Sequence, residues 1–317
     1  MTPFETHPHF GDAAEDHEKP SWIHHVQDCL LAAKKVEKTE PFKALHLVPV
    51  DQPKFKGSLY LIGGGADSSL VSLSKRLAKG DKVACVPFAS DLPNAAELDA
   101  DALVKAGIPA QDIVIILSKG QKPPTDKYNC SEEIPPDATA AFFGGGDQEN
   151  LHDRTDKSQL DAVRKILAKG GIVAGTSAGT AVMSSEMITG GKTSKELTHS
   201  NGFGLVPWAV MDTHVHERSR EQRDITALYD VGKGLPVVGL DPDTAVEFHW
   251  SGNKLIGEIS GEGNVRVFMH SSAAPLEVNR PLAPRVMQTD DGTQREANVW
   301  ELKGGDTFVV PASRPNL

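Results

Sequence analysis

Apolar stretches of this chain end repeatedly at glycine clusters, and this feature restricts the possible fold most. The stretches are continuous rather than alternating, which indicates strands buried on both faces. Helical patterns separate them. The order predicts an α/β fold with a doubly wound, mostly parallel sheet, whose glycine-rich strand ends meet at the edge where such sheets bind ligands. The clearest cases are Ser58–Ile62 before Gly63–Gly65, Ala138–Phe143 before Gly144–Gly146, and Gly171–Ala174 before Gly175 to Gly179.

The pattern predicts one domain over residues 57–317. From about residue 246 it changes to short strand-like stretches, which we interpret as a β-rich extension of the same domain. Residues 1–56 are predicted to be an N-terminal extension, partly disordered, with one amphipathic helix at Trp22–Lys38. The remaining expected elements include strands at 83–88 and 113–117 and helices at 69–79, 97–106 and 158–168.

Composition excludes several classes of protein. The formal net charge of the 317 residues is −10, which argues against nucleic acid or an anionic membrane as a partner. Cys29, Cys85 and Cys130 are too widely spaced for a metal site or a disulfide framework. No signal peptide and no membrane-spanning stretch is recognisable, so we expect a cytoplasmic protein. The histidines near the N-terminus lack accompanying carboxylates or thiols, and no metal is expected.

A candidate nucleophile, Ser177, lies between Gly175 and Gly179, directly after an apolar stretch. The spacing is that of a nucleophile elbow, G-x-S-x-G, in which a sharp strand-to-helix turn exposes one hydroxyl above the sheet. Amides at the start of the following helix can stabilise an oxyanion. The alternative is an ordinary helix-capping serine in a glycine-lined turn.

A serine needs a base and a group that orients the base. His214 and His216 follow an expected strand that ends near His214, and strand alternation places both on one face, so either can be the base. Asp241 follows another expected strand, and a carboxylate there can reach the histidine. The alternative is an Asp-Pro-Asp turn. The order Ser, His, acid differs from that of α/β-hydrolases.

Three arginines follow the histidines in this otherwise acidic chain. Arg218, Arg220 and Arg223 have the rigid guanidinium that binds carboxylates through two hydrogen bonds. The alternative is a solvated basic helix start, whose arginines pair with Glu217, Glu221 and Asp224.

Taken together, these motifs resemble those of cyanophycinases, which are members of the S51 serine peptidases. The resemblance covers roughly residues 57–270 and rests on five motifs in the same order. They are Phe143 to Gln148, Gly175 to Ala181, Asp212-Thr213-His214 with the three arginines, Gly239 to Ala245, and Ile259 to Gly263.

The resemblance implies a flavodoxin-like fold related to class I glutamine amidotransferases, with serine in place of their cysteine. It implies that Ser177 is the nucleophile, that His214 is the base, and that the backbone amides of Gly146 and Ala178 form an oxyanion hole. It also implies substrate contacts from Gln148, Asp212, Arg218, Arg220 and Arg223.

Two positions depart from the cyanophycinase pattern. Thr213 stands where those proteins have glutamine, and Pro242 stands where they have the glutamate that completes the triad. Proline cannot orient an imidazole. We therefore expect Asp241 to be the third catalytic residue, with Asp243 or a carboxylate from elsewhere as alternatives.

The sequence thus predicts a serine-type exopeptidase that hydrolyses aspartyl, specifically β-aspartyl, peptide bonds and releases β-Asp-Arg dipeptides from cyanophycin. It needs no cofactor and no metal, and a homodimer is expected. Two alternatives remain: a dipeptidase for short aspartyl or isoaspartyl peptides, and a weakly active or non-catalytic binding relative, for which Pro242 is the argument. A glutamine amidotransferase is disfavoured because the elbow lacks a thiol.

Overall fold

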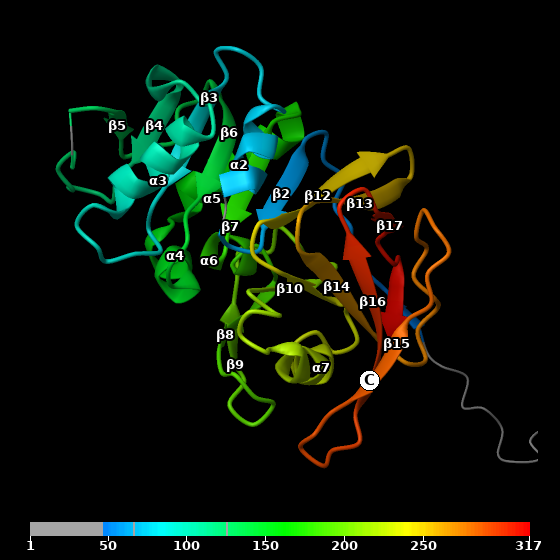
Figure 1. Ribbon diagram of the computed structural model, residues 1–317. Coiled ribbons are helices and arrows are strands. Elements are labelled where there is room, and N and C mark those ends of the chain that lie inside the picture. Colours follow the sequence, from blue (N-terminus) through cyan, green and yellow to red (C-terminus); the bar gives the residue numbers. More distant parts are fainter. Residues whose placement is uncertain (1–46, 66, 125) are drawn as a thin grey trace, which may run out of the picture. The chain divides into compact units, whose positions relative to one another are not determined.

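A mixed sheet of nine strands forms the centre of the protein in the computed structural model, which describes residues 47–65, 67–124 and 126–317 (Figure 1). Six strands are parallel, in the order β2-β7-β6-β3-β4-β5. The predicted α/β fold with a mostly parallel sheet is confirmed. The parallel strands are β2 (Ser58–Ile62), β3 (Lys82–Val86), β4 (Ile113–Ile116), β5 (Asn129–Ser131), β6 (Ala138–Phe143) and β7 (Ile172–Thr176).

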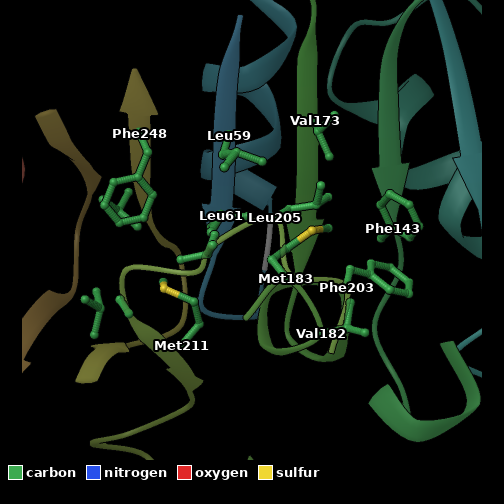
Figure 2. Packing of buried hydrophobic residues seen from close by; sticks show 14 of the residues in the cluster. Leu59, Leu61, Phe143, Val173, Val182, Met183, Phe203, Leu205, Met211 and Phe248 are labelled. Atoms are coloured by element: carbon green, nitrogen blue, oxygen red, sulfur yellow. The ribbon is translucent and has the colours of Figure 1, made fainter. Parts of the chain in front are cut away.

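Helices cover both faces of the parallel strands because their side chains alternate between two buried layers. Leu59 and Leu61 of β2 point into one layer with Val173 of β7, as Figure 2 shows. Tyr60 and Ile62 point into the other layer. The first layer is closed by α5 and α6, the second by α2 and α3. The helices on the connections are α2 (Asp67–Ser74), α3 (Ala95–Lys105), the 3₁₀ helix η1 (Ala110–Asp112), α4 (Gln148–Arg154), α5 (Lys157–Lys169) and α6 (Ala178–Ala181).

The β-rich C-terminal part extends the domain in two directions. β12 pairs antiparallel with β2 and adds β13 and β17 to the central sheet. A second sheet of five strands has the order β10-β11-β14-β16-β15, with α7 packed on it. These elements are β10 (Val210–Thr213), α7 (Glu221–Asp230), β11 (Val237–Leu240), β12 (Thr244–Ser251), β13 (Lys254–Gly261), β14 (Asn264–His270), β15 (Arg285–Gln288), β16 (Glu296–Lys303) and β17 (Thr307–Val309).

Two small strand pairs complete the described part of the chain. β8 (Glu186–Gly190) and β9 (Thr198–Asn201) form a hairpin, and β1 (Leu47–Pro49) pairs with β18 (Ser313–Pro315). The described residues, from 47 onward, cluster as one compact unit. The helix expected at Trp22–Lys38 lies outside the described residues. Within them, no helix combines the length and apolar character needed to cross a membrane.

The carboxyl ends of three neighbouring strands meet where the site forms. β2 ends before Gly63, β6 before Gly144 and β7 before Ser177. The end of β10, from the second sheet, joins them through a hydrogen bond from the amide of His214 to the Gly63 carbonyl, 3.2 Å long. The glycine-rich ends therefore gather at one edge, as the sequence predicts.

Asp99 on α3 carries a partly buried carboxyl group against the backbone of Gly144. Burial raises the pKa of this carboxyl to about 7. The unfolded chain ionises an aspartate near pH 4, whereas the folded protein keeps the proton to about pH 7. The stability that depends on this proton is therefore present below pH 4 and is lost as the pH rises through 7.

We expect Asp99→Asn to become increasingly stable relative to the wild type between pH 4 and 7, by at most about 1.4 kcal/mol per pH unit. Urea unfolding at several pH values measures the difference. Asp51→Asn, which changes an exposed aspartate, is the control. A difference between Asp99→Asn and the wild type that stays constant with pH would contradict the assignment.

Candidate active site

The backbone at Ser177 adopts the strained turn of a nucleophile elbow. Ser177 has φ 52° and ψ −113° and directly precedes α6. A non-glycine residue in such a conformation costs about 1–3 kcal/mol. The neighbouring backbone permits no side chain at either flanking glycine: a Cβ at Gly175 would lie 2.1 Å from the Gly179 carbonyl oxygen, and one at Gly179 would lie 2.1 Å from that of Phe143. The predicted elbow geometry is therefore present.

His214 is the histidine that faces this serine. Its Nε2 lies 3.0 Å from Ser177 Oγ. The expectation that His214 and His216 share a strand face was wrong, because β10 ends at Thr213 and His214 takes a left-handed conformation with φ 54°. His216 is exposed. Of the two candidate bases, the structure brings only His214 to the serine.

The carboxylate on the other side of the imidazole belongs to Glu217. Its Oε2 lies 2.8 Å from His214 Nδ1. The hydrogen bond to His214 lowers the pKa of Glu217. Ser177, His214 and Glu217 thus form a continuous line of hydrogen bonds with the order of a catalytic triad. Sequence reasoning did not select Glu217, although its spacing of three residues from the histidine suits a tight helical turn.

Asp241, expected as the orienting acid, has different partners. Its carboxylate accepts hydrogen bonds from Arg266 Nη1 at 2.7 Å, from the amide of His216 at 3.0 Å and from the amide of Asn264 at 3.2 Å. The geometry therefore corrects the expectation: Asp241 fixes the backbone of the loop after His214 and does not orient the imidazole.

Two backbone amides next to Ser177 are available to a substrate. In the described part of the chain, neither Gly146 N nor Ala178 N donates to a protein acceptor. Ala178 is the first residue of α6, where the helix dipole favours negative charge. Gly145 lies against the Ser177 side chain, so the amide of Gly146 belongs to the same corner. These are the two amides that the resemblance implies for the oxyanion hole.

A polar cavity of about 210 Å³ opens beside Ser177. It collects all five side chains expected to contact substrate: Gln148, Asp212, Arg218, Arg220 and Arg223. The remaining lining comes from Gly146, Asp147, Ser177, Ala181, Ile188 and Thr189. A larger cavity, about 360 Å³, lies among the C-terminal strands and contains none of the predicted site residues.

The arginines of the cavity differ in how much of their hydrogen-bonding capacity the protein uses. Arg223 is buried and donates to both carboxylate oxygens of Asp212, with distances of 2.9 and 2.5 Å. Burial opposes ionisation of Asp212, but Arg223 keeps the pKa of this carboxyl below its usual value. Arg220 donates to the Thr213 carbonyl at 2.8 Å, while its Nε has no partner among the described residues. Arg218 is exposed at the rim. Arg218 and the Nε of Arg220 thus retain hydrogen-bonding capacity that the described residues do not use.

Gln148, at the start of α4, is oriented by the β8–β9 hairpin. Its Nε2 donates to the Ile188 carbonyl at 2.7 Å and to the Thr189 carbonyl at 3.2 Å. The amide oxygen is thereby directed away from these two carbonyls. This hairpin was not expected from the sequence.

The sequence profile of peptidase family S51 matches residues 59–256. This chain belongs to peptidase family S51. The match covers the strands, the elbow and the loop that carries His214, so the site lies within the family's common part. The resemblance inferred from the motifs is confirmed.

Named relatives in the family are cyanophycinases. The protein of Trichormus variabilis is 30% identical over 187 residues, which cover 55% of this chain and 60% of that protein. The chain therefore matches less than two thirds of that relative's length. The protein of Synechococcus elongatus is 28% identical over 247 residues, covering 72% of this chain and 74% of that protein.

Solved structures of peptidases are also similar to this chain. A peptidase from an acI-B1 Actinobacterium has a TM-score of 0.48 at 20% identity, covering 68% of this chain and 92% of that one. A putative peptidase E from Listeria monocytogenes EGD-e has a TM-score of 0.42 at 15% identity, covering 64% and 98%.

The close contact between Gly64 and His214 gives a test of this S51 site. A Cβ at Gly64 would lie 2.3 Å from His214 Cε1 and 2.4 Å from Nε2, so the imidazole must move. We expect Gly64→Ala to lower kcat by about 100-fold or more, the effect of misplacing a reacting group by about 1 Å.

The matched control is Gly80→Ala. Both glycines have positive φ, 114° and 88°, but a Cβ at Gly80 meets no atom within 4 Å. The control thus carries the backbone strain without the contact. Equal kcat values for the two variants in a peptidase assay would show that the position of His214 does not depend on Gly64.

Proposed function

We propose that this protein is a serine peptidase that hydrolyses aspartyl peptide bonds. The observation that carries the proposal is the line from Ser177 Oγ through His214 to Glu217, placed beside a cavity lined by arginines. Membership of peptidase family S51 supports hydrolysis in general.

The reaction begins when Ser177 Oγ attacks the substrate carbonyl while His214 Nε2 accepts the hydroxyl proton. The resulting oxyanion is bound by the amides of Gly146 and Ala178, and donors of this kind contribute about 10²–10³ each to the rate. His214 then gives its proton to the leaving amine. A water molecule hydrolyses the acyl-enzyme by the same proton transfers.

Glu217 serves this cycle by accepting a hydrogen bond from His214 Nδ1–H. The hydrogen bond selects the tautomer in which Nε2 is free to act as a base, and the negative charge stabilises the imidazolium that forms. With Glu217 in this place, Pro242 no longer favours a non-catalytic binding protein.

Substrate selection is assigned to the arginine-lined cavity. Its volume of about 210 Å³ suits one aspartyl residue rather than a long segment. Arg218 and Arg220 supply donors for a carboxylate, and Gln148 supplies an oriented amide.

The polymer cyanophycin is the proposed substrate because the named relatives are cyanophycinases, and exopeptidase release of β-Asp-Arg dipeptides is the proposed reaction. The small cavity also favours a second candidate, hydrolysis of short aspartyl or isoaspartyl peptides. A cytoplasmic location and a homodimer remain predictions from the sequence.

Incubation of the purified protein with cyanophycin and, separately, with β-Asp-Arg distinguishes the two candidates. We expect dipeptides to be released from cyanophycin by the wild type and not by Ser177→Ala. Cleavage of β-Asp-Arg without polymer breakdown would favour the dipeptidase. Polymer breakdown that survives Ser177→Ala would contradict the mechanism.

Glu217→Gln tests the assignment of the orienting acid. The amide carries no negative charge and can also donate to Nδ1, so it neither stabilises the imidazolium nor fixes the tautomer, and we expect kcat to fall by about 10²–10⁴-fold with little change in KM. Glu133→Gln, which changes an exposed glutamate elsewhere on the surface, is the control. An unchanged kcat in Glu217→Gln would show that another carboxylate orients the His214 imidazole.

A further inference from the structure

Two buried carboxyl groups face each other behind the arginine cavity. Asp224 on α7 is 0% exposed and Asp212 on β10 is 2% exposed. The Asp224 carboxyl lies over Gly239 of β11, which pairs with Asp212 in the parallel register, so the two carboxyl groups come together. Asp212 is one of the cavity residues, whereas Asp224 is not part of the lining. The mechanism above leaves Asp224 without a role.

The hydrogen-bond donors around the pair are unevenly distributed. Asp212 accepts from Arg223 and from the Thr213 amide, at 2.7 Å for the latter. Within the described ranges, neither carboxyl oxygen of Asp224 receives a hydrogen bond from any N–H or O–H group. The side chain that it does meet is the Asp212 carboxylate. Two carboxylates cannot form a hydrogen bond unless one of them holds a proton, and two such charges side by side are strongly unfavourable.

We propose that Asp224 is a positioning residue that retains a proton and donates it in a hydrogen bond to Asp212. This bond supports the Asp212 carboxylate from behind while Arg223 binds it from the cavity side. The proposal rests on the proposed function, since it explains how that site receives its charge and its rigidity.

Charged groups from the neighbouring elements agree with this assignment. Arg223 and Arg220 both direct their charge to Asp212, the closest pairing being 2.5 Å for Arg223 and 3.7 Å for Arg220. β11 contributes only Gly239 at this point, where a Cβ would lie 3.1 Å from Asp224 Oδ2. Burial and the adjacent Asp212 raise the pKa of Asp224 well above its usual value.

The other strands packed against α7 carry arginines that are already paired. Arg266 of β14 contacts Asp241 at 2.7 Å and Glu221 at 3.0 Å. Arg285 of β15 contacts Glu221 at 3.2 Å. Neither arginine is paired with the buried carboxyls, so neither supplies the charge that a second carboxylate would need.

The proton on Asp224 determines the charge of the cavity. The lining contains three arginines and two aspartates, Asp147 and Asp212, which leaves one positive charge for a substrate carboxylate. A second carboxylate at Asp224 would cancel this charge. A neutral Asp224 therefore keeps the cavity attractive to anions.

The hydrogen bond from Asp224 to Asp212 is also the first in a series of contacts that reaches Gln148. Arg223, held by Asp212, also donates through Nη1 to the carbonyl of Gly191, in the turn of the β8–β9 hairpin. That hairpin orients Gln148 through Ile188 and Thr189. Loss of the support behind Asp212 should therefore loosen the substrate side of the site rather than Ser177.

Two substitutions separate the proton from the space that Asp224 fills. Asp224→Asn keeps a donor to Asp212, so we expect KM to stay within about threefold of the wild type. Asp224→Leu removes the donor at similar volume, and we expect KM to rise by about tenfold or more, with a smaller change in kcat. Asp230→Asn, on the same helix and paired with Arg295 at the surface, is the control.

Infrared spectroscopy tests the proton without any enzymatic assay. The wild type at pH 7.5 should show the C=O stretching band of one protonated carboxylic acid that Asp224→Asn lacks and Asp230→Asn retains. This measurement does not use Asp224→Leu, so it still tests the proposal if that variant does not fold.

Absence of that band, or an equal rise in KM for Asp224→Asn and Asp224→Leu, would overturn the proposal. Failure of the proposed function is recognised separately, because a wild type that cleaves no aspartyl peptide would still give the band if Asp224 holds the proton.

Discussion

Hydrogen bonds to a single residue of β2 hold the strained turn on which the site depends. The amide of Ser177 donates to the Ile62 carbonyl at 3.0 Å, and Thr180 Oγ1 bonds both the amide and the carbonyl of Ile62, at 3.0 and 2.7 Å. Thr180 Oγ1 also contacts the Gly175 carbonyl at 2.8 Å. Thr180 and Ile62 are buried, so water does not compete with these bonds. They offset the cost of the left-handed backbone at Ser177 and keep its hydroxyl at the sheet edge.

The second half of the site comes from one short loop of the other sheet. Residues 213–220 supply the base, its orienting carboxylate and two cationic side chains. The loop is fixed at its start by the bond from His214 N to Gly63, in its middle by Asp241, and at its end by a 2.9 Å bond from the Arg220 amide to the Val215 carbonyl. The central sheet therefore sets the position of Ser177, while the second sheet sets the positions of the groups proposed to activate it and to bind the substrate. One hydrophobic cluster contains residues of both sheets and holds them in place.

Much of this arrangement can be predicted from sequence because it depends on local patterns. Continuous apolar stretches predicted five of the six parallel strands, all but the short polar β5, and G-x-S-x-G predicted the elbow at Ser177. Spacing alone could not identify the orienting acid, because the left-handed turn at His214 reverses the chain and brings Glu217 back to the imidazole. A strand that continued through His216, as the sequence suggested, made Asp241 the expected acid instead. The β8–β9 hairpin was missed because its strands are short and largely polar, and the second sheet because strand patterns do not specify which strands pair.

Covalent labelling of Ser177 tests the central claim most directly. A fluorophosphonate reacts with a serine only when a base and an oxyanion hole activate its hydroxyl. Incubation of the full chain with this reagent, followed by peptide mass spectrometry, should place one adduct on Ser177, and peptidase activity should fall in proportion to labelling. An adduct on a different residue, or full activity after stoichiometric labelling of Ser177, would contradict the account.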